Sequence, residues 1–140
     1  MKKIKFDTGL QEIAIGGGVL RFNPQDPNLY ARFLEATEKL VAVEQEMVSK
    51  GEAADSSQVV VVLREADRKM KDILNWVFGT GNDFDAILGG VNLLAVGANG
   101  QRVVTNLFHA LEPVILDSAK ACAKTQADAA VKKAEARRSR

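Results

Sequence analysis

The sequence contains little of the chemistry on which most enzymes depend. Its 140 residues include one histidine, His109, and one cysteine, Cys122. No second histidine or nearby Cys/Asp pair completes a site around His109, and ligand spacings such as CxxC or HExxH are absent. The sequence therefore predicts that the protein is not an enzyme and that it binds no cofactor and no metal.

The single cysteine also excludes an intramolecular disulfide, which fits a reducing, cytosolic compartment. Cys122 lies among alanines and lysines in a stretch that offers it no cleft, so we expect an inert thiol. Long apolar runs are missing as well, since none approaches the roughly 20 residues that a bilayer-spanning helix needs. The opening MKKIKF leads to Asp7, Gly9 and Glu12 instead of an apolar signal core. We therefore expect a cytoplasmic protein without membrane contact.

Positive and negative charges nearly cancel, with 19 Lys and Arg against 18 Asp and Glu and a net charge of +1. This balance argues against strong attraction of the whole chain to nucleic acid. The distribution is uneven, because residues 117–140 hold seven Lys and Arg against three Asp and Glu, whereas residues 1–116 carry a net charge of −3. A basic tail thus follows a mildly acidic body.

Two long stretches carry the strongest structural signal. In residues 27–49 and residues 57–78, apolar residues recur at alternating steps of four and three, which places them along one face of an α-helix. The connection between them is short and polar, so we expect the two helices to pack as an antiparallel hairpin. The two apolar faces comprise Leu29, Phe33, Ala36, Leu40, Val43 and Met47, and Val59, Leu63, Ala66, Met70, Ile73 and Val77.

Local residues mark the ends of these helices. Asp26 suits the N-cap of the first helix, and Pro27 suits its first position, where a missing N–H costs nothing. Ser56 or Ser57 can cap the second helix, and Gly79 can end it. The polar face of the second helix is expected to comprise Arg64, Glu65, Asp67, Arg68, Lys69, Lys71 and Asp72.

Shorter elements are expected on either side of the hairpin. Residues 11–22 read as a β-hairpin, because Gly16-Gly17-Gly18 separates two short apolar runs and no Lys-Ser/Thr follows to make a phosphate loop. Residues 1–10 contain alternating Ile4 and Phe6, which makes a strand conceivable there. Asn82 or Asp83 can cap one or two helical turns from Phe84, a reading preferred to a Ca²⁺ loop because the EF-hand pattern is not met.

The last part of the chain is expected to hold a further helix over residues 101–116, which Pro113 would bend or interrupt. Residues 117–140 are rich in alanine and form a basic C-terminal tail or helix, either exposed to solvent or ordered on a partner. Composition supports a globular domain, with 46% apolar and 26% charged residues. The predicted fold is mostly α with a small N-terminal β-hairpin: a helical hairpin plus further helices in one domain, residues 1–116.

Three segments carry a resemblance to a known family: residues 13–33 (IAIGGGVLRFNPQDPNLYARF), residues 72–81 (DILNWVFGTG) and residues 104–115 with Phe108, Leu111 and Pro113. Their order resembles the tail assembly chaperones of long-tailed phages and prophages of Gram-positive bacteria. Those proteins typically place a short hairpin before an Asn-Pro/Asp-Pro junction and a helix, then an I-D-x-I-F-G-x-G segment and a Phe-Leu-x-x-Leu-x-Pro helix. Trp76, the glycine-rich run 89–100 and the basic tail depart from that pattern.

The resemblance implies a chaperone that binds the tape measure protein and keeps it soluble during tail assembly in the host bacterial cytoplasm. It also implies recruitment of the tail tube protein, and we expect a homo-oligomer. A helical hairpin can offer a groove to an amphipathic partner helix. Under this hypothesis the partner contacts are Phe33, Met47, Met70, Trp76 and Phe78; the alternative is that all five fill the core.

Two other classes stay open. The protein could be a virion structural or head–tail connector component, which would remain in the purified particle. It could instead be a small nucleic-acid-binding regulator that uses the basic run 132–140. No aromatic residue follows Phe108, so the stacking platforms of single-strand binders are missing and nucleic acid is the less favoured partner.

Overall fold

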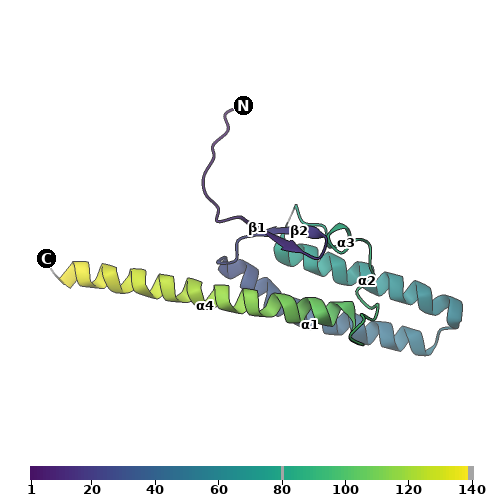
Figure 1. The fold of residues 1–140 in the computed structure, drawn as a ribbon. Coiled ribbons are helices and arrows are strands. Elements are labelled where there is room, and N and C mark those ends of the chain that lie inside the picture. The colour runs from purple at the N-terminus through teal and green to yellow at the C-terminus, as the bar shows by residue number, and fades with distance from the viewer. Residues whose placement is uncertain (80, 139–140) are drawn as a thin grey trace.

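The computed structural model describes residues 1–79 and 81–138. Its elements are β1 (Gln11–Ile15), β2 (Gly18–Phe22), α1 (Pro27–Glu52), α2 (Ser56–Phe78), α3 (Phe84–Ile87) and α4 (Val103–Arg138). This confirms the predicted fold class of a mostly helical chain with a small N-terminal β-hairpin. Figure 1 shows α1 and α2 folded back on each other, with α4 running beside α1 and projecting beyond it. Among the described residues, no helix is both long and apolar enough to cross a bilayer.

The α1–α2 hairpin holds most of the core. In α1, five of the six residues of the predicted apolar face are buried, and Val43 is half-buried. In α2, Ala66, Met70 and Val77 are buried as predicted. The other three residues of the predicted face, Val59, Leu63 and Ile73, are half-buried, and Leu63 and Ile73 pack against the core.

The cap of α2 also differs from the prediction. Asp55, rather than Ser56 or Ser57, is the N-cap, and its carboxylate accepts the backbone N–H of Gln58 at 2.9 Å. The Gln58 side chain in turn accepts the Asp55 N–H at 3.2 Å, which completes a capping box. The Gln58 N–H and the Ser57 hydroxyl lower the pKa of Asp55 by stabilising its charged form. The predicted Asp26 cap of α1 is confirmed.

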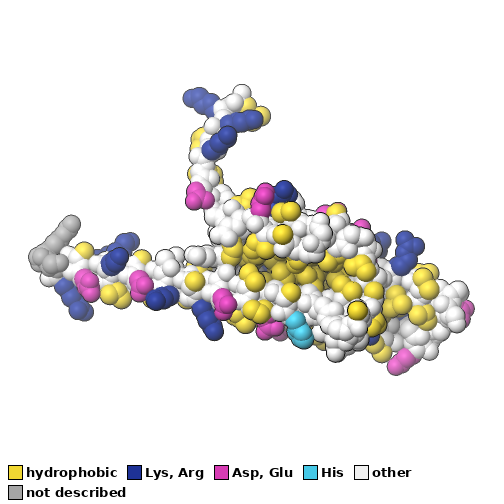
Figure 2. Space-filling view, viewed as in Figure 1, with side chains coloured by type: hydrophobic (Ala, Val, Ile, Leu, Met, Phe, Trp, Pro, Cys, Tyr) yellow, Lys and Arg dark blue, Asp and Glu magenta, His cyan; other side chains and the backbone are white. Residues whose placement is uncertain are grey.

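The β-hairpin forms as predicted, with Ile15 paired to Gly18 across the turn. Gly16 has a φ of +55°, which a residue with a Cβ rarely adopts. The hairpin packs on the helices through Phe22, whose ring meets Phe78 edge-on at a centroid distance of 5.2 Å. Hydrophobic side chains gather between the hairpin and α4 (Figure 2).

Asn82 fastens the hairpin to the end of α2. Its side chain is buried, accepts the Arg21 N–H at 2.8 Å and donates to the Arg21 carbonyl at 2.7 Å. Asn82 therefore does not cap α3, whereas Asp83 does so by accepting the N–H groups of Asp85 and Ala86.

The C-terminal helix is longer than the sequence indicated. α4 is continuous from Val103 to Arg138, so residues 117–138 adopt the solvent-exposed helix that was one of the two forms considered, without a break at residue 116. Pro113 lies inside it on an exposed side, where the carbonyl of His109 that loses its helical partner can bond water. The buried residues of α4, Leu107, Leu111 and Ile115, all lie in its first half.

Residues 1–10 form an extended arm and not the strand considered for Ile4 and Phe6. The arm leaves the body at Thr8, whose carbonyl accepts the Asn23 side-chain amide at 3.0 Å. Both Ile4 and Phe6 are more than three-quarters exposed, at 86% and 77%. Figure 1 shows the arm rising away from the body.

Candidate binding surface

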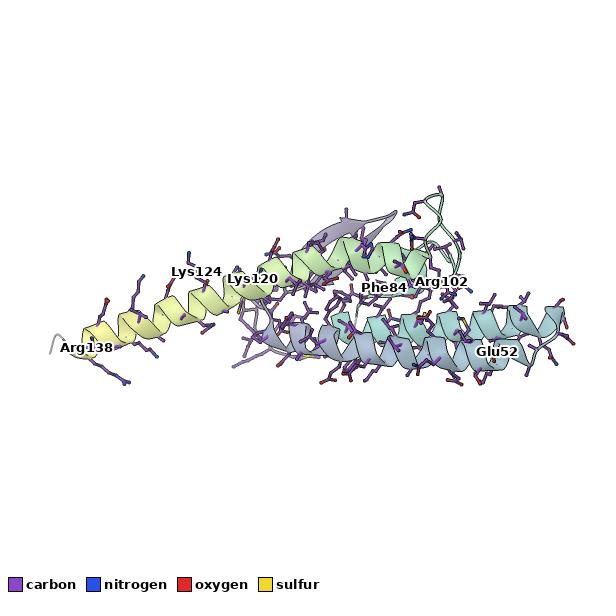
Figure 3. All side chains as sticks on the ribbon, turned by 90° about the horizontal axis from the view of Figure 1, so that it is seen from below. Glu52, Phe84, Arg102, Lys120, Lys124 and Arg138 are labelled. Carbon is purple, nitrogen blue, oxygen red and sulfur yellow. The ribbon has the colours of Figure 1, made fainter. Side chains whose placement is uncertain are left out.

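An open groove of about 300 Å³ lies between α1 and α4. Its apolar floor comes from three helices, with Leu40 and Val41 on α1, Met70 on α2, and Val104 and Phe108 on α4. Figure 3 shows side chains of α1 and α4 facing each other across this space. The surface called the α1–α4 groove below comprises Thr37, Leu40, Val41, Glu44, Met70, Val104, Thr105, Phe108, His109 and Glu112.

Contacts at the start of α4 set the position of this groove. The Phe108 ring stacks on Phe33 of α1, with centroids 5.3 Å apart and planes 29° apart. Arg102, just before α4, places its guanidinium 3.0 Å from the Glu44 carboxylate. The Val104 N–H donates to the Leu93 carbonyl at 2.9 Å and so ties α4 to the preceding loop.

The groove continues along the outer face of α1. Leu34, Val41 and Val48 are spaced seven residues apart, which places them in one row, and they are 50%, 52% and 48% exposed. A second hollow of about 500 Å³ contains Val48 and shares Val41 and Glu44 with the α1–α4 groove. Together they form one apolar strip along more than three turns of α1.

The rim of this strip is acidic. Glu112 lines the α1–α4 groove, Glu52 lines the second hollow, and Glu44, whose carboxylate pairs with Arg102, lines both. Residues 27–52 as a whole contain five glutamates against three Lys and Arg. An apolar strip flanked by carboxylates is complementary to an amphipathic helix with Lys or Arg beside its apolar face.

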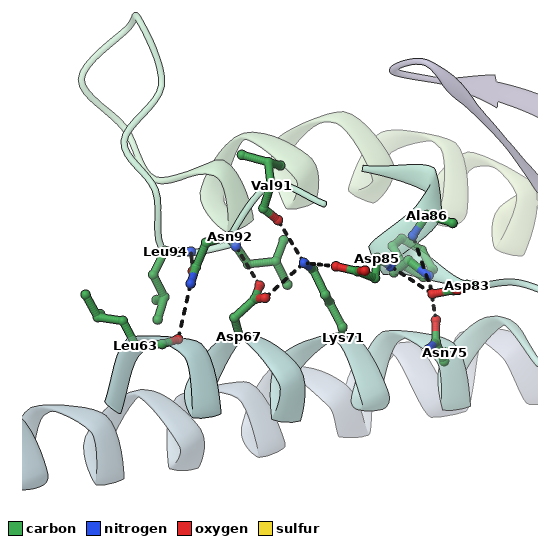
Figure 4. A network of polar contacts seen from close by, with 12 residues as sticks. Leu63, Asp67, Lys71, Asn75, Asp83, Asp85, Ala86, Val91, Asn92 and Leu94 are labelled. Carbon is green, nitrogen blue, oxygen red and sulfur yellow. Dashed lines mark hydrogen bonds and ion pairs between the residues drawn. The ribbon is translucent and has the colours of Figure 1, made fainter. Parts of the chain in front are cut away.

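A larger cleft of about 610 Å³ lies beside α2 and is lined mostly by charged residues, of which Lys71, Asp67 and Asp85 pair with one another. Lys71, predicted to face solvent, is 4% exposed, and its ammonium donates to Asp67 at 2.9 Å, to Asp85 at 2.7 Å and to the Val91 carbonyl at 2.8 Å. Asp67 also accepts the Leu93 N–H at 2.8 Å. Figure 4 shows this network joining α2 to α3 and to the loop that follows.

The electrostatics of Lys71 fit a structural brace. Burial alone would lower the pKa of its ammonium, but the hydrogen bonds and charges of Asp85 and Asp67 outweigh that effect, so the pKa is raised above its usual value. Lys71 therefore carries its charge at neutral pH and holds the loop that leads into α4. We interpret this cleft as part of the scaffold that positions the α1–α4 groove.

Four of the five residues predicted as partner contacts lie in the core. Phe33, Met47, Met70 and Phe78 are 4%, 8%, 2% and 6% exposed, as the core-filling alternative expects. Only Met70 reaches the floor of the α1–α4 groove. The structure does not bring the five together on one surface.

Trp76 is the exception, with 40% of its surface exposed. It does not line the α1–α4 groove; the Lys39 ammonium lies 3.7 Å from the centre of its ring in a cation–π contact. Trp76 thereby helps to join α1 to α2.

The sequence reading missed the row formed by Leu34, Val41 and Val48. Their seven-residue spacing was a readable signal, since it defines a second apolar line beside the core face of α1. The reading also missed that α4 leaves Val41 uncovered, which depends on the tertiary position of α4.

The structure also shows the surroundings of the single histidine and the single cysteine of the sequence. His109 is exposed at the rim of the α1–α4 groove. Cys122 is half-buried and lines a hollow of about 290 Å³ with Pro24, Pro27 and Tyr30, so the expectation that its surroundings offer no cleft was wrong. The hollow exists because α4 continues past the start of α1.

No group of three or more His, Cys, Asp or Glu suited to a metal ion occurs in residues 1–79 and 81–138. Comparison with protein-family models, with curated proteins and with solved structures found no match.

Proposed function

We propose that the protein is a phage tail assembly chaperone that binds an amphipathic helix of the tape measure protein in the α1–α4 groove and keeps that protein soluble in the host cytoplasm. The observation that carries the proposal is the continuous apolar strip along α1. Its central residue, Val41, is half exposed, and glutamates lie at its rim. Contiguous apolar patches on a protein surface often mark interaction sites.

The resemblance adds the identity of the partner. Its three segments fall on the β-hairpin and the start of α1, on the end of α2, and on the first half of α4. The first and third of these segments flank the α1–α4 groove. A tape measure protein is long and helical, and its exposed apolar faces would aggregate unless covered; recruitment of the tail tube protein would follow once they are.

The test is co-expression with a tape measure protein from a long-tailed phage of Gram-positive bacteria, with its soluble fraction as the readout. The native chain should raise that fraction, and Val41→Arg should remove the gain because it puts a charge in the strip. Val60→Arg is the matched control, since Val60 on α2 is 58% exposed and lines neither hollow of the strip. Equal effects of the two substitutions, or no gain from the native chain, would contradict the proposal.

The two alternative classes of protein predict different results in two simple experiments. A virion structural or connector protein would be found by mass spectrometry in purified particles, whereas a chaperone would be absent from them. A nucleic-acid-binding regulator would use the exposed basic residues of α4, which include Lys132 and Lys133. It would bind DNA at low salt and lose that binding as salt rises.

A further inference from the structure

The two edges of the β-hairpin differ in how their backbone groups are satisfied. The two-residue turn makes Ile15 and Gly18 a hydrogen-bonded pair, so the alternation of the ladder points the backbone of Arg21 away from β1. The Arg21 N–H and C=O face outward on β2, and Asn82 bonds both. The outer edge of β2 is therefore closed.

The outer edge of β1 is open. By the same alternation, the N–H and C=O groups of Glu12 and Ala14 point away from β2. Within the described residues, neither backbone has a hydrogen-bond partner on that side. Exposed edges of this kind are templates on which another extended segment can pair.

The same chain carries a segment with the matching pattern. Residues 1–6 are extended, no described group bonds their backbone, and Ile4 and Phe6 alternate with Lys3 and Lys5. In a strand this alternation puts Ile4 and Phe6 on one face, together with Lys2 near the end of the arm, and puts Lys3 and Lys5 on the other. A two-stranded hairpin alone is marginal, and a third strand with an apolar face strengthens it.

We propose that the N-terminal arm of a second copy pairs antiparallel with the open edge of β1, so that two copies exchange arms. The inner face of the hairpin presents half-buried Ile13 and Ile15, and a register with Ile4 opposite Ile13 extends that apolar face. The same register puts Lys5 opposite Glu12, an opposite-charge pair across the two strands. The backbones of Lys3 and Lys5 then meet those of Ala14 and Glu12.

In the structure the arm does not pair with the hairpin of its own chain. The Asn23 side-chain amide donates to the Thr8 carbonyl, and beyond this point the arm turns away from β1 and is not folded back beside it. Since arm and open edge lie at the same end of the molecule, exchange between two copies is reciprocal and closes a dimer. The inference stands apart from the proposed function, because the α1–α4 groove takes no part in it.

The test is sedimentation analysis of the full chain and three variants over a range of concentrations. The native chain should form a dimer, and the double variant Ile4→Ser, Phe6→Ser should weaken it by about tenfold for each side chain removed. Ala14→Pro should also abolish dimers, because proline removes the N–H that points to the arm while leaving the β1–β2 ladder intact. Lys3→Ser, on the outer face of the arm, is the control and should dimerise like the native chain.

The double variant leaves the body of the protein untouched, so its result does not depend on folding. A native chain that stays monomeric would overturn the proposal, as would a dimer that survives both the double variant and Ala14→Pro. Val41→Arg should dimerise normally, which separates failure of this inference from failure of the chaperone assay.

Discussion

The cleft beside Lys71 and the α1–α4 groove lie on the same helical hairpin but differ in what lines them. In the cleft, the Lys71 ammonium makes three hydrogen bonds, and its partners Asp67 and Asp85 come from α2 and α3. In the groove, the central residue Val41 is half exposed and has no apolar cover. The Lys71 network in the larger hollow is thus satisfied from within, whereas the apolar row in the smaller one is left for a partner.

The difference teaches that volume alone does not mark a binding site. A buried ion pair that has all its partners contributes to holding a structure in one arrangement, and removing one partner is costly. An exposed apolar row contributes little to the fold and gains only when another surface covers it. The two regions should therefore respond in opposite ways to substitution.

The largest effect is expected at the cleft. Lys71→Met should lower the free energy of unfolding by about 2 kcal/mol, because Asp67 and the Val91 carbonyl lose their partner. The value is below the roughly 3–5 kcal/mol of a fully buried pair because the Asp85 side chain is 64% exposed. Urea denaturation measures this loss of stability. Lys69→Met is the control, because Lys69 belongs to an exposed ion-pair network with Glu46. It should lower the free energy of unfolding by less than about 1 kcal/mol.

The pH dependence of that loss sharpens the assignment. The folded state raises the pKa of Lys71, so its contribution is complete below the unfolded lysine pKa of about 10.4 and disappears as pH rises through the higher folded value. The difference in stability between the native chain and Lys71→Met should stay constant from pH 7 to 9 and shrink only in stronger alkali. A difference that already falls between pH 7 and 9 would show that the ammonium is not the source.

A smaller effect is expected at the ion pair beside the groove. Arg102→Ala removes an exposed pair with Glu44, whose two side chains are 41% and 50% exposed. It should cost under about 1 kcal/mol in urea denaturation, and less at high salt. A loss as large as that of Lys71→Met would mean that this pair, and not packing, holds α4 against α1.

The smallest effect on stability is expected inside the strip. Val48→Ser should change the free energy of unfolding by no more than about 0.5 kcal/mol, since Val48 is 48% exposed. The same variant should reduce the soluble fraction of a co-expressed tape measure protein. A marked loss of stability without any loss of chaperoning would remove the distinction between the two regions.

Local signals predicted the elements well. Asp26 and Pro27 fixed the start of α1, and the glycines at residues 16–18 fixed the turn of the β-hairpin. The core face of α1 followed from spacing alone, because α2 covers that face along its length. These features depend on residues close together in the sequence.

The predictions that were wrong concern features that depend on residues far apart in the sequence. Lys71 reads as part of a solvent face until Asp85 and the Val91 carbonyl, 14 and 20 positions away, are placed over it. Asn82 has the sequence position of a helix cap, but its side chain bonds the backbone of Arg21, which lies 61 positions away in the sequence. The α1–α4 groove likewise exists only because α4 lies beside α1, so the five contacts proposed from sequence fell mainly on the core.

Hydrogen–deuterium exchange of the protein, alone and with a soluble fragment of a tape measure protein, tests the central claim most directly. Slower exchange in residues 37–48 of α1 and residues 104–112 of α4, with no change around Lys71, is the predicted result. Protection confined to the Lys71 cleft, or no protection at a fragment concentration that forms the complex, would contradict the assignment of the α1–α4 groove as the binding surface.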